Sequence, residues 1–449
     1  MATAPSQPVR SILLSFLVLI LAGTAALKLP AATPPEQPIN WIDALFTATS
    51  AVCVTGLIVR DTGSAFTVTG QAIVVALIQL GGLGIMTFGL LIAAGIRGKL
   101  SLAGRQLIEH TLAGSGARGE LWALLRLVVT FTFFAELAGA AAMFVAFKPG
   151  RTAAEAAWTS VFHSISAFCN AGFSLWSDSL MAFQGSWWVN LIFMALIVFG
   201  GLGFLTLYEM RRARGRFQPL SLHAKLVLTV TAVLVVGGAV LFRLAETGEE
   251  LADAGLGTRV LASLFQSVTA RTAGFNTVDT AALAPAALFV IILLMYVGGS
   301  PGSTAGGVKT TTLGVLALAS WHRLRHRQHV NAFRRTIPPI TVQNTLAIAM
   351  TGIAVTLVGL LVLLFIEAPP TDLQADASTF LDYLFETVSA LNTVGLSTGV
   401  TPTLSPAGRL WVTLLMFVGR LGPLTFAAAL IASRPRRDWQ HPTEEVVVG

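Results

Sequence analysis

Four short segments, each closed by a glycine, contain the residues whose types and spacing could do chemistry. The glycines lie 116, 102 and 121 residues apart and are Gly56, Gly172, Gly274 and Gly395. Three of the segments carry the dipeptide Ser-Ala at the same distance before the glycine, at 50–51, 166–167 and 389–390. Four diverged copies in one chain predict four similar units around one axis. Because main-chain carbonyls from four such segments can replace the water shell of a potassium ion, the pattern predicts a cation pore.

The composition places the chain in a membrane. Of its 449 residues, 54% are hydrophobic and 11% are charged, which is more apolar than a soluble domain. A helix needs about 20 apolar residues to cross roughly 30 Å of hydrocarbon. Such stretches lie near 10–29, 70–96, 120–147, 186–210, 224–245, 286–320, 341–367 and 407–433. We therefore expect an all-α integral membrane protein with eight transmembrane crossings.

The glycine segments need elements that aim them at one centre. We expect four tandem units of helix, pore loop and helix (M1-P-M2) around a pseudo-four-fold central pore, spanning 1–100, 101–216, 217–335 and 336–449. Short pore helices are predicted near 40–51, 154–167, 257–269 and 378–390. About twelve residues cannot span a bilayer, so these helices should descend partway and return. The negative ends of their dipoles would then favour a cation.

Positive charge follows every second crossing, which predicts orientation. The net charge is +7, and basic clusters occur at 97–118, 211–216, 323–335 and 434–437. By the positive-inside rule both termini are cytoplasmic and the pore loops enter from outside. A nucleic-acid role is disfavoured because topology alone explains these arginines. The first apolar stretch could instead be a signal peptide, although its removal would leave the first unit without an outer helix.

Each segment glycine has two readings. A strand that aims successive carbonyls at one axis needs backbone angles that a Cβ would penalise, and a glycine can also simply cap a helix. Four copies at one offset favour the first reading, and the same residues could serve both. Cys53 and Cys169 share an offset before the first two glycines. Two cysteines form neither a disulfide framework nor a metal site by spacing, so we expect buried thiols.

Together these segments resemble the Trk/Ktr/HKT superfamily of potassium transporters over nearly the whole chain. Besides the four glycine segments, the resemblance rests on Gly81-Gly-Leu-Gly84, Gly200-Gly-Leu-Gly203, the Gly/Ser-rich stretch 298–307 and Val418-Gly-Arg-Leu-Gly-Pro423. Eight crossings are most similar to the KtrB-type membrane subunit rather than to the ten-helix members. Glycine in all four segments is similar to the potassium-selective members.

The resemblance implies a selectivity filter made by the residues before and at each glycine. Its potassium-binding residues would be Val54, Thr55, Gly56, Asn170, Ala171, Gly172, Thr272, Ala273, Gly274, Thr393, Val394 and Gly395. The segments depart from the Thr-Val-Gly-Tyr-Gly of potassium channels, because each keeps one glycine among mixed neighbours. We expect weaker discrimination against sodium than a channel shows.

The resemblance also implies a gate below the filter. The Gly/Ser-rich stretch 298–307 interrupts the crossing near 286–320. Non-helical backbone at this depth is tolerated where it lines a cavity or is buried in protein. The gate residues would be Gly298, Gly299, Ser300, Pro301, Gly302, Ser303, Thr304, Ala305, Gly306, Gly307 and Arg420. A static kink is the alternative for the stretch. Its partial match to a phosphate-binding loop fails in spacing and in context.

Several other intramembrane charges are open to more than one reading. An arginine at 420 would sit beneath the filter, as a barrier to cations, as a ligand of loop carbonyls, or both. Arg271 lies within the third segment and could shut the pore if it pointed inward; we favour a position behind the filter, toward Asp279 or the end of a pore helix. Glu209 should form an interfacial salt bridge with a neighbouring arginine, whereas the role of Glu136 stays open.

Potassium is the expected substrate, and the resemblance adds sodium as an activator. It also implies a homodimer with a cytoplasmic RCK-type nucleotide-binding regulatory subunit (KtrA-like), in the lipids of the cytoplasmic (inner) membrane. No organic cofactor or nucleic-acid partner is expected. No transition metal is expected either, because His322 and His326, although spaced i, i+4, have arginines between them. An enzyme is disfavoured because no nucleophile, base or metal cluster is visible. A secondary transporter with alternating access is the main alternative. It would show broken helices in both halves, whereas we expect a break in the third unit alone.

Overall fold

Helices are the main secondary structure of the described residues. A computed structural model describes residues 6–95, 117–367 and 377–422. Along these residues a long helix, a short helix and a further helix follow one another four times. The long helices are α1 (Ser6–Leu27), α6 (Ala117–Phe147), α10 (Leu222–Ala245) and α14 (Pro339–Glu367). The short ones are α2 (Trp41–Val52), α7 (Ala153–Phe168), α11 (Leu256–Thr269) and α15 (Ala377–Leu391).

Each short helix is followed by a further helix. These helices are α4 (Val68–Gly95), α8 (Trp187–Gly201), α12 (Pro285–Tyr296) and α16 (Pro406–Leu421), with α3 (Thr62–Ala65), α9 (Phe204–Arg212) and α13 (Thr310–Leu324) beside them. Single 3₁₀ turns lie at Met181–Phe183, Glu249–Leu251, Thr280–Ala282 and Thr401–Thr403. One small antiparallel hairpin, β1 (Val330–Ala332) and β2 (Arg335–Ile337), departs from the all-α expectation.

The four short helices occur within two residues of their predicted positions, which confirms those predictions. Local sequence explains where they begin: Asn40 caps α2 by accepting from the Asp43 amide, and Thr152 forms a capping box with Glu155 at α7. Each helix buries one phenylalanine completely, namely Phe46, Phe162, Phe265 and Phe385. These rings fix the face that each short helix turns toward its neighbours.

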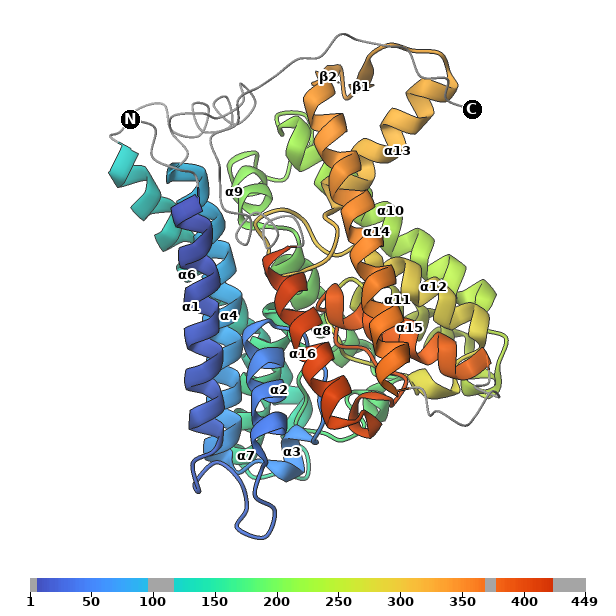
Figure 1. Cartoon of the computed structure of the whole chain (residues 1–449). Helices are drawn as coiled ribbons and strands as arrows, with labels where there is room; N and C mark the ends of the chain where they lie inside the picture. Colours follow the sequence, from blue (N-terminus) through green and yellow to red (C-terminus); the bar gives the residue numbers. More distant parts are fainter. Residues whose placement is uncertain (1–5, 96–116, 368–376, 423–449) are drawn as a thin grey trace.

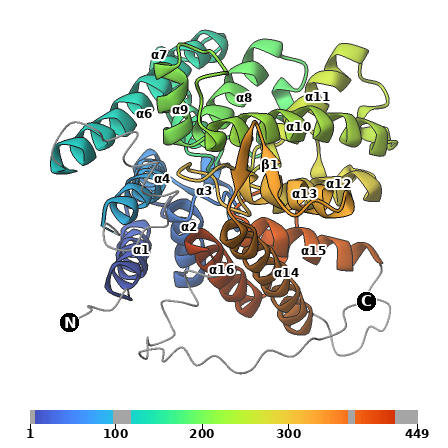
Figure 2. The same ribbon diagram turned by 90° about the horizontal axis from the view of Figure 1, so that it is seen from above.

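The chain runs once around a ring. Viewed from above, the helices proceed from α1 and α4 through α6 and α8, then α10 and α12, to α14 and α16 (Figure 2). The last helix, α16, packs against α2 near the start of the chain. The largest apolar core cluster joins residues of α2 and α4 to Val412, Leu415 and Met416 of α16.

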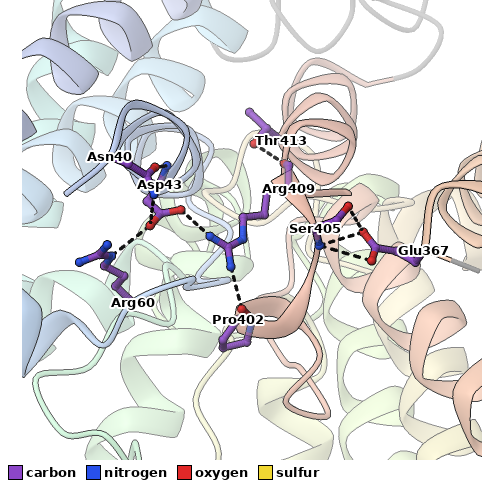
Figure 3. Close-up of polar contacts among 8 residues, drawn as sticks. All are labelled: Asn40, Asp43, Arg60, Glu367, Pro402, Ser405, Arg409 and Thr413. Atoms are coloured by element: carbon purple, nitrogen blue, oxygen red, sulfur yellow. Dashed lines mark hydrogen bonds and ion pairs between the residues drawn. The ribbon is translucent and has the colours of Figure 1, made fainter. Parts of the chain in front are cut away.

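Ion pairs of a buried carboxylate join the two ends of this ring (Figure 3). Asp43 on α2 is 3% exposed and pairs with Arg409 of α16 at 2.7 Å and with Arg60 at 3.0 Å. Arg409 also donates to the carbonyl of Pro402 at 2.8 Å. The first and last quarters of the chain are therefore joined by a direct ion pair.

The outer surface is apolar, as a bilayer requires. Phe133, Phe134, Val236, Leu244 and Phe365 on the long helices are each more than half exposed. By length and composition, three helical stretches among the described residues could cross a membrane, at Leu125–Phe147, Leu222–Ala245 and Pro339–Glu367. The bent pair α8 and α9 makes a fourth. The eight predicted crossings are not confirmed by this criterion.

Two of the helices that follow the short ones are broken. The predicted interruption is confirmed, because α12 ends at Tyr296 and α13 begins at Thr310. A second break was not predicted: α8 and α9 meet at 100°. Gly203, with φ 82°, allows the chain to turn there, and the amide of Phe204 bonds the carbonyl of Gly302 at 3.2 Å. The expectation that only the third unit is broken is wrong.

Some sequence predictions fall outside the described residues. They concern the basic residues at 97, 99, 105, 434, 436 and 437, and Pro423.

Candidate functional site

The four glycine segments meet at one centre. A Cβ built on Gly56 would lie 2.5 Å from the carbonyl oxygen of Ala171, which precedes Gly172. The same contact recurs in order around the ring, from Gly172 to Ala273 at 2.9 Å and from Gly274 to Val394 at 2.7 Å. A Cβ on Gly395 would overlap the carbonyl oxygen of Thr55, which returns to the first segment. Each glycine therefore leaves room for a carbonyl of the next segment.

The backbone dihedral φ alternates in sign along every segment. The four glycines have φ between 71° and 96°, and the residue two before each glycine also has positive φ, at Val54, Asn170, Thr272 and Thr393. For β-branched residues such as valine and threonine a positive φ is a true outlier. It costs roughly 1–2 kcal/mol per residue, and backbone strain of this kind concentrates at functional sites. Sequence reasoning did not find it, because these residue types normally avoid this conformation.

Hydrogen bonds from the short helices hold the strained backbone. Ser50 and Ser389 accept from the amides of Gly56 and Gly395, each at 3.1 Å. Ser166 donates to the carbonyl of Phe173 at 2.8 Å, and Thr269 donates to that of Phe275 at 2.6 Å. The serine of the recurring Ser-Ala pair is thus a brace for the turn. In the third segment a threonine one residue later takes this place, because α11 ends one residue earlier relative to its glycine.

Eight carbonyls at the centre have no donor. The two residues before each glycine are at most 1% exposed. No hydrogen bond from a described residue ends on the carbonyl oxygens of these eight residues, at 54–55, 170–171, 272–273 and 393–394. Buried carbonyls are almost always satisfied by protein, water or a ligand. A ring of such oxygens suits a dehydrated monovalent cation.

Further glycines set how closely the next helices approach. A Cβ on Gly81 or Gly200 would overlap the carbonyl oxygen of the last residue of the short helix, Val52 or Phe168. Gly419 has the same relation to Leu391 in the last quarter. The sequence showed these glycines as part of a family pattern, and the structure gives their physical reason. They bring α4, α8 and α16 onto the ends of α2, α7 and α15.

The stretch between α12 and α13 lies against the ring (Figure 2). The amides of Ser300 and Thr304 bond the carbonyls of Gly201 and Gly200 at 2.9 and 3.2 Å. A Cβ on Gly306 would overlap Oγ1 of Thr393, which belongs to the fourth segment. The loop 298–307 is therefore fixed to α8 on one side and touches the glycine ring itself.

Two cations also hold this loop. Arg420, 6% exposed, donates from Nη1 to the carbonyl of Thr304 at 2.5 Å. Its Nε and Nη2 atoms are buried without a partner. Lys309 Nζ donates to the carbonyls of Ala305 and Gly306 at 2.7 and 3.3 Å. From sequence, Lys309 was considered only as the lysine of the rejected phosphate-binding loop, although a lysine two residues after an intramembrane glycine stretch was a usable signal.

The remaining charges depart from expectation in two cases. Arg271 does not reach Asp279; its Nη2 atom lies 3.5 Å from the carbonyl of Gly298, at the start of the loop. Glu209 forms no salt bridge with a described residue and instead accepts from the amide and hydroxyl of Ser221 at 2.9 and 2.8 Å. A serine at a helix start supplies two donors without a long side chain, which replaces the expected ion pair.

Glu136 lies behind the second segment. It is 8% exposed and accepts from Gln79 Nε2 at 3.1 Å. Ser164 of α7 donates to its main-chain carbonyl at 2.6 Å. Cys169 is buried beside Gln79, and both cysteines are free thiols, as expected. Glu136 is thus part of the packing between α6, α4 and α7.

Fold and site together define a membrane transporter for cations. The sequence profile of the TrkH family, described as "Cation transport protein", matches residues 10–436. The chain belongs to this family, and the resemblance to the Trk/Ktr/HKT superfamily is confirmed. It is a transporter of a membrane-embedded, multi-pass class and not an enzyme.

Individual relatives cover nearly the whole chain. It is 38% identical to the Ktr system potassium uptake protein B of Bacillus subtilis, over 98% of this chain and 97% of that protein. It is 36% identical to the potassium/sodium uptake protein NtpJ of Enterococcus hirae, over 99% and 97%. A crystal structure of the potassium transporter TrkH from Vibrio parahaemolyticus superposes with a TM-score of 0.72 at 20% identity, covering 94% of this chain and 84% of the other. That likeness shows the fold.

Proposed function

We propose that the chain takes up potassium across the cytoplasmic membrane through the glycine ring. The observation that carries the proposal is the set of eight buried carbonyl oxygens without a donor among the described residues, at the two positions before each glycine. Relatives named as potassium uptake proteins agree with it. The twelve filter residues are those of 54–56, 170–172, 272–274 and 393–395, and they hold the ion by main-chain oxygens.

The proposed architecture follows from the same ring. Four M1-P-M2 units surround one pore, with eight crossings, two per unit, and both termini in the cytoplasm. The bent α8 and α9 pair counts as one of these crossings, and so does the interrupted α12 and α13 pair. The four short helices point their C-terminal ends at the ring, where their dipoles stabilise a cation.

The loop 298–307 is the proposed gate. Hydrogen bonds from the loop to α8, and from Arg420 and Lys309 to the loop, hold it in place. It also touches the fourth filter segment. Loss of the Arg420 bond would weaken the hold on Thr304, whose amide and hydroxyl would still bond Gly200 and Phe168. The buried guanidinium also opposes passage of a cation below the filter.

In this proposal, partner subunits regulate transport by this chain. The names of several relatives place them in a Ktr system, which supports association with other Ktr components. The proposed partners are a second copy of this chain, in a homodimer, and a cytoplasmic RCK-type nucleotide-binding subunit (KtrA-like). Sodium is a proposed activator, and one relative is named as a potassium/sodium uptake protein. No organic cofactor is assigned to this chain.

Ion flux into liposomes tests the proposal. The purified chain is reconstituted and uptake of rubidium is measured with potassium or sodium as the competing ion. Potassium should compete at lower concentration than sodium, and addition of a nucleotide-binding subunit should change the rate. Equal competition by both ions would reject the filter as proposed.

An alternating-access transporter is the second candidate, because two helices are broken rather than one. The bend between α8 and α9 removes the sequence argument against it. The repeats, however, follow one another in the same sense around one axis. Alternating-access transporters instead use rigid-body motion around a site at the membrane midplane. Saturable uptake of an organic solute by the reconstituted chain would favour the second candidate.

A further inference from the structure

A wide cleft lies away from the glycine ring, beside the hairpin. It measures about 1320 Å³ and lies between α9, the start of α10, α13, β2 and the start of α14. The hairpin and α9 lie at the same end of the molecule (Figure 1). The potassium pathway proposed above does not use this cleft.

The cleft is lined by cations that lack partners. Arg212, Arg214, Arg216 and Arg335 line it, against a single glutamate. No hydrogen bond or ion pair joins any of these four guanidinium groups to a residue in the described part of the chain. The glutamate, Glu209, is already occupied by two donors of Ser221. The wall therefore offers a surplus of planar donors, which match phosphate oxygens well.

A half-buried histidine lines the same space. His223 is the second residue of α10, and its Nε2 atom is buried without a hydrogen-bond partner among the described residues. Buried polar atoms in native proteins are normally satisfied by protein, water or a ligand. This atom is a second, independent sign that the cleft holds a polar group.

Other features place that group at a membrane surface. The cleft includes the first turns of α10 and α14, two helices long and apolar enough to span. Leu222, Leu226 and Val315 line its inner side. Just outside, Phe217 and Phe333 are 45% and 41% exposed and pack edge to face at 5.9 Å. Exposed aromatic rings beside arginines and apolar side chains suit a lipid whose headgroup is anionic.

We propose that this cleft binds the phosphate headgroup of an anionic phospholipid. The arginines hold the phosphate oxygens, His223 Nε2 adds a hydrogen bond, and the acyl chains leave along the apolar faces of α10 and α14. A free phosphate ion shares the headgroup chemistry but would not use the apolar side. The proposal does not depend on which ion the pore carries.

Lipid binding by the full chain tests it. The purified, delipidated protein is titrated with phosphatidylglycerol or phosphatidylcholine, and bound lipid is counted by native mass spectrometry. The test variant carries Arg214→Gln and Arg335→Gln, and the matched control carries Arg323→Gln and Arg327→Gln, which remove the same charge from arginines that do not line the cleft. Single Arg335→Gln, on an exposed strand, serves if the double variant folds poorly.

The expected result is selective retention of phosphatidylglycerol by the wild type and by the control. The test variant should lose roughly thirtyfold in apparent affinity, from about fivefold per arginine near a membrane surface. An equal loss in test and control variants would overturn the site, because general surface charge would then explain binding. Complete displacement of the lipid by millimolar inorganic phosphate would overturn the lipid and leave a free-anion site.

Discussion

Single residues decide the chemistry of the ring by backbone conformation rather than by side chain. Val54, Thr272 and Thr393 hold a positive φ that their branched side chains disfavour. The cost is offset by serine and threonine braces and by complete burial. Such strain persists only where the surroundings over-determine it, which agrees with a ring of oxygens held in place for an ion.

Gly274→Ser should lower the preference for potassium over sodium. A Cβ there would lie 2.7 Å from the carbonyl oxygen of Val394, at φ 77°. A strain of 1–2 kcal/mol on one carbonyl would reduce the selectivity ratio about tenfold. The ratio is read from rubidium uptake with competing potassium and sodium.

Gly237→Ser is the control for that change, because a Cβ on this α10 glycine meets nothing within 4 Å. It should leave the ratio unchanged. If Gly274→Ser kept the wild-type ratio in a folded protein, this glycine would not belong to the filter.

The four glycines stood out from sequence because a repeat shows equal offsets directly, whereas the two residues before each glycine were assigned as ion ligands from the resemblance. Sequence did not predict where Arg271 points. A guanidinium at the end of a long side chain can reach several acceptors, and the carbonyl of Gly298 belongs to a loop whose path no local pattern specifies.

At the scale of elements, the loop 298–307 depends on the bend between α8 and α9. The Gly203 turn lets Phe204 bond Gly302, while Gly200 and Gly201 accept from the loop. Sequence located the short helices well, since caps and buried phenylalanines are local signals. The bend was missed because the apolar stretch 186–210 reads as continuous, although its three glycines permit a break.

Arg420→Gln should raise the basal flux. The wild-type side chain donates to the carbonyl of Thr304, and a hydrogen bond from a charged group contributes about 1.5–3 kcal/mol. Loss of that bond should increase the open population, and thus potassium flux, by roughly tenfold or more. Flux is measured in liposomes without any partner subunit.

Arg323→Gln is the matched control for charge, because Arg323 lies at the exposed end of α13. Its flux should equal the wild type. A slower or unchanged Arg420→Gln protein would show that this arginine does not hold the gate closed.

Deletion of 302–304 should also raise the flux, because it removes several loop contacts at once, including the Thr304 carbonyl that accepts from Arg420. It removes the Gly302 carbonyl that accepts from Phe204 and the Thr304 groups that bond Gly200. Non-helical backbone that no longer crosses the pathway cannot obstruct it. The deletion protein should keep its potassium preference, since the ring is untouched; a folded protein that conducts no faster would contradict gating.

At the scale of the whole molecule, four units can make one pore only if the ring is closed. Neighbouring units are joined by chain connections, but the first and last are joined by packing between α2 and α16 and by the Asp43 to Arg409 pair (Figure 3). Sequence indicated the ring from its four copies. It could not indicate the closing pair, whose partners are 366 residues apart and follow no shared pattern.

A double-mutant cycle tests whether that pair closes the ring. Asp43→Asn and Arg409→Gln are made singly and together, and the free energy of unfolding is measured by chemical denaturation in micelles. Asp43 is nearly buried while Arg409 is 21% exposed, so a coupling of about 1–2 kcal/mol is expected for contacting groups.

Arg60→Gln is the comparison, because Arg60 pairs with the same carboxylate inside the first quarter of the chain. Both arginine variants should lower stability, but only Arg409→Gln should also lower the selectivity for potassium, because only it loosens the contact between the first and fourth filter segments. Coupling below about 0.3 kcal/mol, or the same selectivity in both variants, would place ring closure in the apolar packing of α2 against α16 instead.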